Sequence, residues 1–323
     1  MSRIFALIVA LLSAAVLGAA SVSAQSFPQR AVKFILPFGP GSGVDTTARL
    51  LGDKLSQRWG KPVVVENRPG GDGLVSINAF LSANDDHTLM FIPASTFTAH
   101  PYTKDKVPYD SERDLLPIVN VTVIVLAISA PASLNVNSLA EFVALARAKP
   151  NTLNVAAAAG NSDLIMASFI KKENLPIAKI PYRDIMQAPN DLAEGRIHLL
   201  LASYAAMRPL IQAGKLKLLA VTSRARVGIA PDTPTTAEAG FPFLGIESLI
   251  GLIGPRGMPA ALRDSIAADV RAIVNADPTI ATRLGATGQI VDIRGPAEFA
   301  TGIKAMRDQL ADIAKILEIK PAR

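Results

Sequence analysis

A glycine-rich segment, PFGPGSGVD at residues 37–45, has the composition of a loop that binds an anion. Backbone N–H groups at the start of a helix attract negative charge, and glycine lets a ligand approach them closely. Pro40 would stiffen the segment, Ser42 adds a hydroxyl, and Asp45 stands where a cap or first-turn carboxylate stabilises a helix. A tight strand-to-helix turn without a ligand remains an equally good interpretation. The glycines are Gly39, Gly41 and Gly43.

This segment does not match either of the common nucleotide-binding loops. The phosphate-binding loop of NTPases requires a lysine that reaches the outer phosphates, and the segment has none. The dinucleotide-binding fingerprint requires a third glycine at a fixed spacing, and no glycine stands at that place after Gly41. The segment therefore favours a different anion or no ligand.

Residues typical of catalysis or metal binding are sparse. The chain has no cysteine, which excludes thiol chemistry, disulfides and a lipoprotein anchor. Its three histidines, His87, His100 and His198, are far apart and fit no metal-binding motif. The sequence GNSDL at 160–164 lacks the second glycine of a nucleophile elbow. We therefore predict no catalytic residue, no metal and no cofactor.

Three further segments with small polar residues follow apolar runs that predict strands. They could be simple turns, or they could supply amides and hydroxyls to the same cleft as residues 37–45. We expect all three to be loops. They are PASTF (93–97), AAAGNSD (157–163) and LASY (201–204).

Alternating strands and helices must position these segments. Residues 32–37 predict a buried strand, residues 44–59 a helix, and residues 62–66 a second strand, which together favour a parallel sheet covered by helices. Ser138 and Glu141 predict a capping box before another helix. Two more helices are indicated, one opened by Pro259 and one with an apolar stripe on a single face. The stripe consists of Phe299, Ile303, Met306, Leu310, Ile313 and Leu317.

The N-terminus predicts export from the cytoplasm. Arg3, an apolar stretch and the small residues up to Ala24 fit a signal peptide at 1–24, although a membrane anchor is the competing interpretation. Its removal lowers the formal charge from +6 to +5. Lysines and arginines are scattered without a dense block, so we expect no nucleic-acid partner.

The 323 residues are long enough for two lobes, but no low-complexity linker separates them. Two lobes would then be joined at ordinary strands, as when one domain is inserted into another. Candidate crossings lie near residues 123–127 and 247–252.

Longer segments resemble the substrate-binding proteins of tripartite tricarboxylate transporters, known as Bug or TctC-like receptors. The resemblance begins at AVKFILPFGPGSGVDTTARLL, covers essentially all of the mature chain, and is most specific at PVVVENRPG and at LAVTS followed by PTTAEAG.

The resemblance implies an α/β, two-lobed periplasmic-binding-protein (type II, Venus-flytrap) fold with the ligand cleft between the lobes. Lobe 1 would comprise residues 25–125 and 247–323, and lobe 2 residues 126–246. Such receptors typically hold small organic carboxylates by backbone amides, hydroxyls and waters. Matching to the family's cleft segments, with Pro40 and Asp45 added from the composition of the loop at 37–45, gives these candidate ligand-binding residues: Phe38, Gly39, Pro40, Gly41, Ser42, Asp45, Ser95, Thr96, Gly160, Asn161, Ser162, Tyr182, Asp184, Ala202, Ser203 and Tyr204.

This sequence departs from the family at several positions near the ligand. Asp86 and His87 replace a Gly-Tyr pair, His198 and Ala202 replace two aspartates, and Leu249 replaces a frequent tryptophan. These departures predict a ligand without an amino group or a more apolar pocket. Asp184 would contact a cationic or hydroxyl-bearing part of the ligand, or face solvent.

Together these features predict a monomeric periplasmic receptor that delivers a small organic carboxylate to the membrane permease subunits of a tripartite tricarboxylate transporter. A ligand-sensing receptor for a signalling partner and an exported hydrolase are the alternatives.

Overall fold

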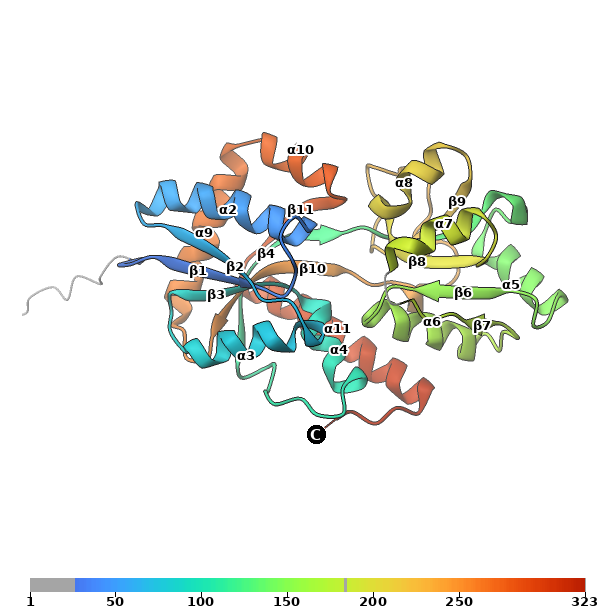
Figure 1. Cartoon of the computed structure of the whole chain (residues 1–323), viewed down its shortest axis with the longest axis horizontal. Helices are drawn as coiled ribbons and strands as arrows, with labels where there is room; N and C mark the ends of the chain where they lie inside the picture. The colour runs from blue at the N-terminus through green and yellow to red at the C-terminus, as the bar shows by residue number, and fades with distance from the viewer. Residues whose placement is uncertain (1–26, 183–184, 323) are drawn as a thin grey trace, which may run out of the picture.

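The computed structural model describes residues 27–182 and 185–322. The predicted signal peptide at 1–24 and the candidate residue Asp184 lie outside the described residues. Two lobes stand side by side along the long axis of the molecule, each built on its own mixed β-sheet (Figure 1).

The first lobe contains a six-stranded sheet in the order β11-β4-β10-β3-β1-β2. Strands β1, β2 and β3 are parallel, as the sequence predicts, whereas β10 is antiparallel to both β3 and β4. The predicted parallel sheet is therefore only partly correct, because the strand that returns from the second lobe runs in the opposite direction. The strands are β1 (Val32–Leu36), β2 (Val63–Asn67), β3 (Thr88–Pro93), β4 (Leu115–Ile124), β10 (Ser248–Pro255) and β11 (Gln289–Arg294).

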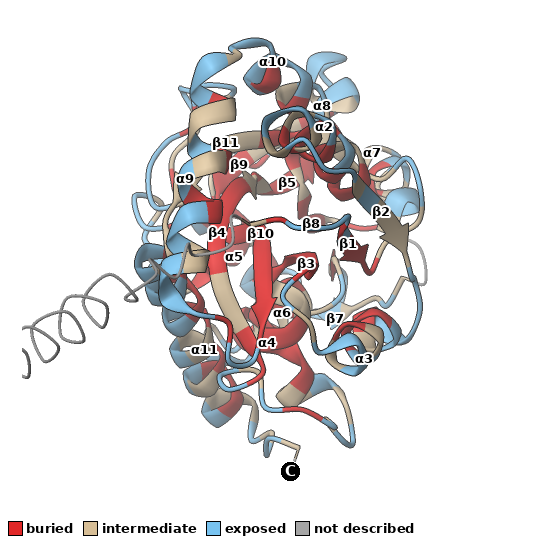
Figure 2. Cartoon of the chain, turned by 90° about the vertical axis from the view of Figure 1, so that its left-hand side faces the viewer, coloured by how far each residue is buried: buried red, intermediate tan, exposed pale blue. Residues whose placement is uncertain are grey.

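Helices cover both faces of this sheet. One apolar cluster joins the sheet to α2 (Gly43–Trp59), α9 (Ala260–Ala276) and α10 (Thr279–Ala286). Another joins it to α3 (Leu74–Ala83), α4 (Ala94–Thr103) and the beginning of α11 (Pro296–Leu317). Every residue of β10 is buried, and Figure 2 shows this strand in the centre of the lobe. Because helices cover both faces of this sheet, its central strands are buried on both sides and their sequences are continuous apolar runs.

The second lobe contains a five-stranded sheet in the order β7-β6-β8-β5-β9. On one face α5 (Leu139–Ala148), α6 (Asn161–Lys172) and the end of α11 pack against it, and on the other α7 (Ala188–Ala193) and α8 (Tyr204–Gln212) do so. The strands are β5 (Leu126–Pro131), β6 (Asn154–Ala157), β7 (Ala178–Lys179), β8 (Leu199–Ser203) and β9 (Leu216–Val221).

The helix starts follow local sequence signals closely. Ser42 caps α2 by accepting a hydrogen bond from the Asp45 N–H, and Ser138 caps α5 by accepting one from the Glu141 N–H. The predicted capping box of α5 is only half formed, because the Glu141 carboxylate accepts the N–H of Asn137, at 2.7 Å, in place of the Ser138 N–H. Pro259 directly precedes α9, as predicted.

Helix α11 belongs to both lobes. Its first half places Phe299 and Ile303 in the core of the first lobe, and its second half places Leu310 and Ile313 in the core of the second (Figure 1). The expected assignment of residues 247–323 to lobe 1 does not describe this second half. The division of the chain into 25–125 with 247–323 and 126–246 stays a prediction. Within the described residues, no helix combines the length and the apolar character needed to cross a membrane.

Candidate functional site

A cleft of about 990 Å³ lies between the two lobes and is lined by residues of both. Its walls are formed where strands of each sheet end and the following helices begin, which is the usual position of ligands in α/β sheets.

Four of the helices that start at this cleft follow closely after a strand. Residues of the first turns of α2, α4, α6 and α8, or immediately before them, line it. The predicted loops at 93–97 and 201–204 are wrong in detail, because α4 begins directly after β3 and α8 directly after β8. Their small polar residues therefore lie at helix N-termini, where the first backbone N–H groups have no partner within the helix.

Three of these N-termini have no side-chain cap. Ser42 caps α2, accepting the Asp45 N–H at 3.2 Å, but the described residues provide no such bond for α4, α6 or α8. An uncapped N-terminus keeps both its N–H donors and its partial positive charge for a ligand. The cleft can therefore bind an anion without a charged side chain.

Asp45 stabilises the loop at residues 37–43 and does not itself line the cleft. It is 2% exposed and its carboxylate accepts hydrogen bonds from the N–H of Gly41 at 2.8 Å, the amide of Asn67 at 2.8 Å and Arg49 Nε at 3.0 Å. Burial alone would raise the pKa of Asp45, but the hydrogen bonds from Arg49, Gly41 and Asn67 outweigh it and lower the pKa below its ordinary value. The Gly41 N–H, predicted to face a ligand, is thus bound to Asp45.

The structure brings most, but not all, of the predicted site residues to the cleft. Tyr204 lies in the core of the second lobe, where its hydroxyl donates to the Ile229 carbonyl at 3.3 Å. Asp184 is outside the described residues. The cleft is lined by Phe38, Ser42, Ser95, Thr96, Gly160, Asn161, Ser162, Tyr182, Ala202 and Ser203, whereas Gly39, Pro40, Gly41, Asp45 and Tyr204 do not line it.

Tyr182 lines the cleft from the second lobe. Its hydroxyl donates a 2.6 Å hydrogen bond to Asp191, which directs the oxygen toward α7. Burial, together with the Asp191 carboxylate, raises the pKa of Tyr182 to about 12, so the phenol stays protonated.

The turn at Gly70–Gly73 is a wall of the cleft that the candidate residues omit. Its four residues all have positive φ, and a Cβ on Gly73 would lie 2.6 Å from Cγ2 of Thr96. His100 fixes the turn: its Nε2 lies 2.9 Å from the Asp72 carbonyl oxygen, and its Nδ1 lies 2.6 Å from the Tyr109 hydroxyl. Since a carbonyl only accepts, Nε2 carries the proton and Tyr109 donates to Nδ1. Burial lowers the pKa of His100, which keeps the ring neutral.

Gln289, on β11, also lines the cleft and was not predicted. Its Nε2 donates to the Gly43 carbonyl at 2.8 Å, and its Oε1 accepts the Thr122 hydroxyl at 2.6 Å. Gln289 therefore fixes the start of α2 to the sheet. No local signal could have revealed a contact between residues 246 positions apart.

The described cleft lining contains no lysine or arginine. Its three carboxylates each pair with a basic residue that is not among the described lining residues, so they add little net charge. Positive potential in the cleft therefore comes mainly from the helix N-termini. The pairs are Asp72–Lys104, Asp163–Lys179 and Glu247–Arg294.

The two lobes touch at both sides of the cleft. On one side, the Asn161 side-chain amide on α6 donates to the Thr98 hydroxyl on α4 at 3.3 Å. On the other, Gly288 approaches Ala205 at the start of α8 so closely that a Cβ on Gly288 would lie 2.3 Å from the Ala205 Cβ.

The residues at which this sequence departs from its family mostly lie away from the cleft. The His198 ring accepts the N–H of Asn154 at 3.2 Å, and Leu249 is fully buried in the first lobe. Asp85, Asp86 and His87 have ligand atoms within 4.8 Å of one another, so among the described residues they are the group that most resembles a metal site. They lie at the end of β3 opposite the cleft, and Asp85 is already hydrogen bonded to Arg30 and Thr88.

The fold and cleft define a two-lobed periplasmic-binding-protein architecture, and comparison with known proteins gives the family. Residues 47–294 match the model of the tripartite tricarboxylate transporter family receptor, TctC. The chain belongs to this family of solute-binding receptors, which confirms the resemblance and makes it a receptor and not an enzyme.

Solved structures agree with this assignment. A periplasmic transporter is 29% identical, with a TM-score of 0.74 over 91% of this chain and 99% of that chain. A Rhodopseudomonas palustris protein with adipate is 26% identical, with a TM-score of 0.75 over 91% and 99%. MatC from the same organism, with bound malate, is 25% identical, with a TM-score of 0.71 over 89% and 99%.

Proposed function

We propose that this receptor closes on a small organic carboxylate in the cleft and delivers it to the membrane subunits of a tripartite tricarboxylate transporter. The signal-like sequence at 1–24 supports export to the periplasm, with cleavage after Ala24. Closure would be driven by contacts that the ligand makes with both lobes only in the closed state.

The observation that carries the proposal is the convergence of helix N-termini on a cleft whose described lining lacks lysine and arginine. A carboxylate accepts several hydrogen bonds at once, and backbone N–H groups with hydroxyls such as Ser95 and Ser162 can donate them. A cationic ligand would be repelled by the same helix ends.

The relatives support a carboxylate as the ligand class. One was solved with adipate and another with malate, both of which carry two carboxyl groups. Among the residues that depart from the family pattern, Ala202 lines the cleft, where it favours a partly apolar pocket in this chain.

A thermal-shift screen of residues 25–323 tests the proposal, using mono-, di- and tricarboxylates and aromatic acids. The protein is first unfolded and refolded to remove bound ligand. A ligand at one hundred times its Kd should stabilise the fold by about 2.7 kcal/mol. The absence of a shift with every acid would contradict the carboxylate assignment and leave the fold unaffected.

Two substitutions of Ser203 test whether the ligand places a negative charge at the start of α8, one adding a charge and the other serving as a neutral control. Ser203 lines the cleft at the N-cap of α8 without capping the helix, and both Asp and Asn are good N-cap residues. Ser203→Asp should weaken carboxylate binding by about tenfold or more through charge repulsion, whereas Ser203→Asn should bind nearly normally. Equal affinities of the two variants, measured by calorimetry, would argue against an anion at this position.

Capture experiments with liganded protein separate transport from sensing. Retention of permease subunits from a membrane extract supports delivery, and retention of a sensor kinase ectodomain in their place would contradict it.

A further inference from the structure

The strand order of the two sheets divides the cleft into three parts. Strands β4, β5 and β10, through which the chain crosses between the lobes, lie toward one end of the cleft, which we call the hinge end. Strands β2 and β7 are the outermost strands at the other end, which we call the mouth, and Figure 2 shows them on the side of the molecule opposite β9 and β11. Between the two ends, β1, β3, β6 and β8 lead into α2, α4, α6 and α8. The helix N-termini therefore occupy the middle of the cleft.

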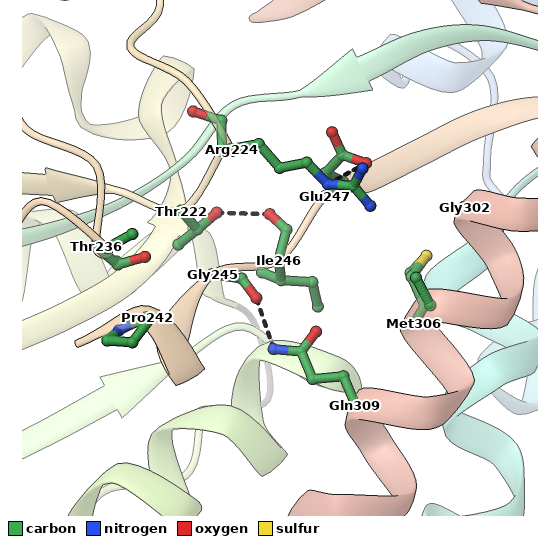
Figure 3. A pocket seen from close by; sticks show the side chains of 13 residues that line it. Thr222, Arg224, Thr236, Pro242, Gly245, Ile246, Glu247, Gly302, Met306 and Gln309 are labelled. Carbon is green, nitrogen blue, oxygen red and sulfur yellow. Dashed lines mark hydrogen bonds and ion pairs between the residues drawn. The ribbon is translucent and has the colours of Figure 1, made fainter. Parts of the chain in front are cut away.

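The charged and amide groups at the hinge end are already bound within the protein. Gln289 is hydrogen bonded through both the nitrogen and the oxygen of its side-chain amide. Arg294 holds both carboxylate oxygens of Glu247, at 2.9 and 3.0 Å. The Ile246 carbonyl accepts the Thr222 hydroxyl at 2.9 Å, beside a smaller cavity of about 280 Å³ beneath α11 (Figure 3). These groups therefore offer no cation and no amide donor to a ligand.

The mouth carries apolar side chains from both lobes. Phe38 follows β1, and its carbonyl accepts the Asn67 side-chain amide at 2.9 Å, which fixes Phe38 to the end of β2. Tyr182 and Ile185 follow β7 and pack partly against the core of the second lobe, whereas the next residue, Met186, is 61% exposed. Phe38, Tyr182, Ile185 and Met186 all line the cleft. An exposed methionine inside a ligand cleft is a surface that an apolar part of the ligand can cover.

The polar side chains described at the mouth do not favour a second carboxylate there. The Tyr182 hydroxyl already donates to Asp191 at 2.6 Å. On the first lobe, the turn after β2 presents the Asp72 carboxylate, which is 76% exposed and would repel another anion. Its partner Lys104 is not among the described lining residues, and Asp72 compensates its charge. A carboxylate at the mouth would therefore lose water without gaining a cation, which costs free energy.

We infer that the ligand is an acid with one carboxylate and an apolar body, bound with the carboxylate among the helix N-termini and the body at the mouth against Phe38, Tyr182 and Met186. This inference rests on the proposed function and narrows its substrate class. The cleft, of about 990 Å³, is at the upper end of the roughly 300–1,000 Å³ typical of small-molecule sites, so a body as long as that of hexanoate has room. Because Phe38 and Met186 belong to different lobes, such a body would be covered fully only when the lobes close.

Hexanoate and adipate form a matched pair, because they have the same number of carbon atoms and differ only in the second carboxylate. In calorimetry with residues 25–323, refolded to remove bound ligand, hexanoate should bind about tenfold or more tightly than adipate. Along acetate, butyrate and hexanoate, each buried methylene should tighten binding by roughly threefold. Adipate that binds as tightly as hexanoate, or more tightly, would overturn this inference and leave the proposed function intact, whereas no binding of any carboxylate would contradict both.

Met186→Gln tests where the apolar body lies. Glutamine keeps the length of the side chain and makes it polar, and the exposure of this position should leave the fold intact. The variant should bind hexanoate about threefold or more weakly and acetate with unchanged affinity. Ile229→Gln is the control, because Ile229 is an apolar residue that is 42% exposed and is not among the lining residues of the cleft, so it should change neither affinity. Unchanged hexanoate affinity in Met186→Gln, or an equal loss in Ile229→Gln, would overturn the placement of the body at the mouth.

Discussion

At the scale of single residues, the cleft depends on side chains that stabilise its backbone, Asp45 without lining the cleft and His100 as one of its lining residues. Asp45 holds the N–H of Gly41, and His100 holds the carbonyl of Asp72. Both fix segments that contribute residues to the wall of the cleft. A buried, fully hydrogen-bonded side chain is well suited to this task, because its own position is set by packing.

Replacing Asp45 should therefore reduce stability and change its pH dependence. The Asp45→Asn variant loses charge-assisted hydrogen bonds from Gly41 and Arg49, which should cost about 2 kcal/mol at pH 7. The pKa of Asp45 is lower in the folded than in the unfolded chain, so the ionised carboxylate stabilises the fold above about pH 4. This contribution disappears as the pH falls through the folded pKa.

Urea unfolding of wild type and Asp45→Asn between pH 3 and pH 7 measures this effect. The difference between their unfolding free energies should shrink toward low pH. Asp53→Asn, on the exposed face of the same helix, is the control and should show little difference at any pH. A constant difference for Asp45→Asn would show that the carboxylate charge is unimportant.

Local sequence signals predicted part of the candidate site. Glycines, serines and threonines after apolar runs marked all four strand-to-helix junctions, because special backbone geometry needs these residue types locally. Tyr109, His100 and Gln289 had no such signal, since no local motif joins them to partners that are 9, 28 and 246 positions away. Whether Tyr182 or Ser203 contacts a ligand stays a prediction.

At the scale of elements, two features shape the cleft. Helices α4 and α8 begin where the sequence predicts loops, and Gly288, just before β11, lies close to the start of α8. Serine and threonine favour turns, so the sequence predicts loops at 93–97 and 201–204, but α4 and α8 start directly after the buried strands β3 and β8. The contact of Gly288 with Ala205 then sets how closely the lobes can approach at one side of the cleft.

A side chain at position 288 should hinder closure. Gly288 has a φ of +77°, and a Cβ there would meet the Ala205 Cβ at 2.3 Å. Gly288→Ala should therefore weaken ligand binding, in addition to a backbone cost of about 1–2 kcal/mol in stability. Gly240→Ala is a matched control, because Gly240 has a φ of +89° with nothing within 4 Å of its added Cβ.

Calorimetry with a ligand from the carboxylate screen decides this point. Both variants should lose similar stability, and only Gly288→Ala should lose affinity. Adding Ala205→Gly to Gly288→Ala removes the colliding Cβ and should restore binding. If Gly240→Ala loses as much affinity, or if the double variant is not rescued, the contact does not control closure.

At the scale of the whole molecule, the lobes are connected by more than the two strand crossings. The chain passes from β4 to β5 at Val125 and returns through Glu247 into β10, while α11 contributes to both cores. The apolar stripe of α11 was predicted from its spacing, but periodicity does not reveal which core each residue enters. A helix shared in this way should make the two lobes unfold together.

The final prediction tests this coupling by changing one lobe and observing the other. Leu310 is 1% exposed in the second-lobe core, and Leu310→Ala should cost about 2–5 kcal/mol through the cavity that it leaves. The single tryptophan, Trp59, lies in the first lobe, where its indole donates to Asp269 at 2.7 Å. If α11 makes the lobes cooperative, Leu310→Ala should shift the urea midpoint reported by Trp59 fluorescence as far as the midpoint reported by circular dichroism. Lys304→Ala, at an exposed position of the same helix, should shift neither. An unchanged Trp59 midpoint together with an earlier transition in circular dichroism would mean that the second lobe unfolds alone, and that α11 packs against it without coupling the two cores.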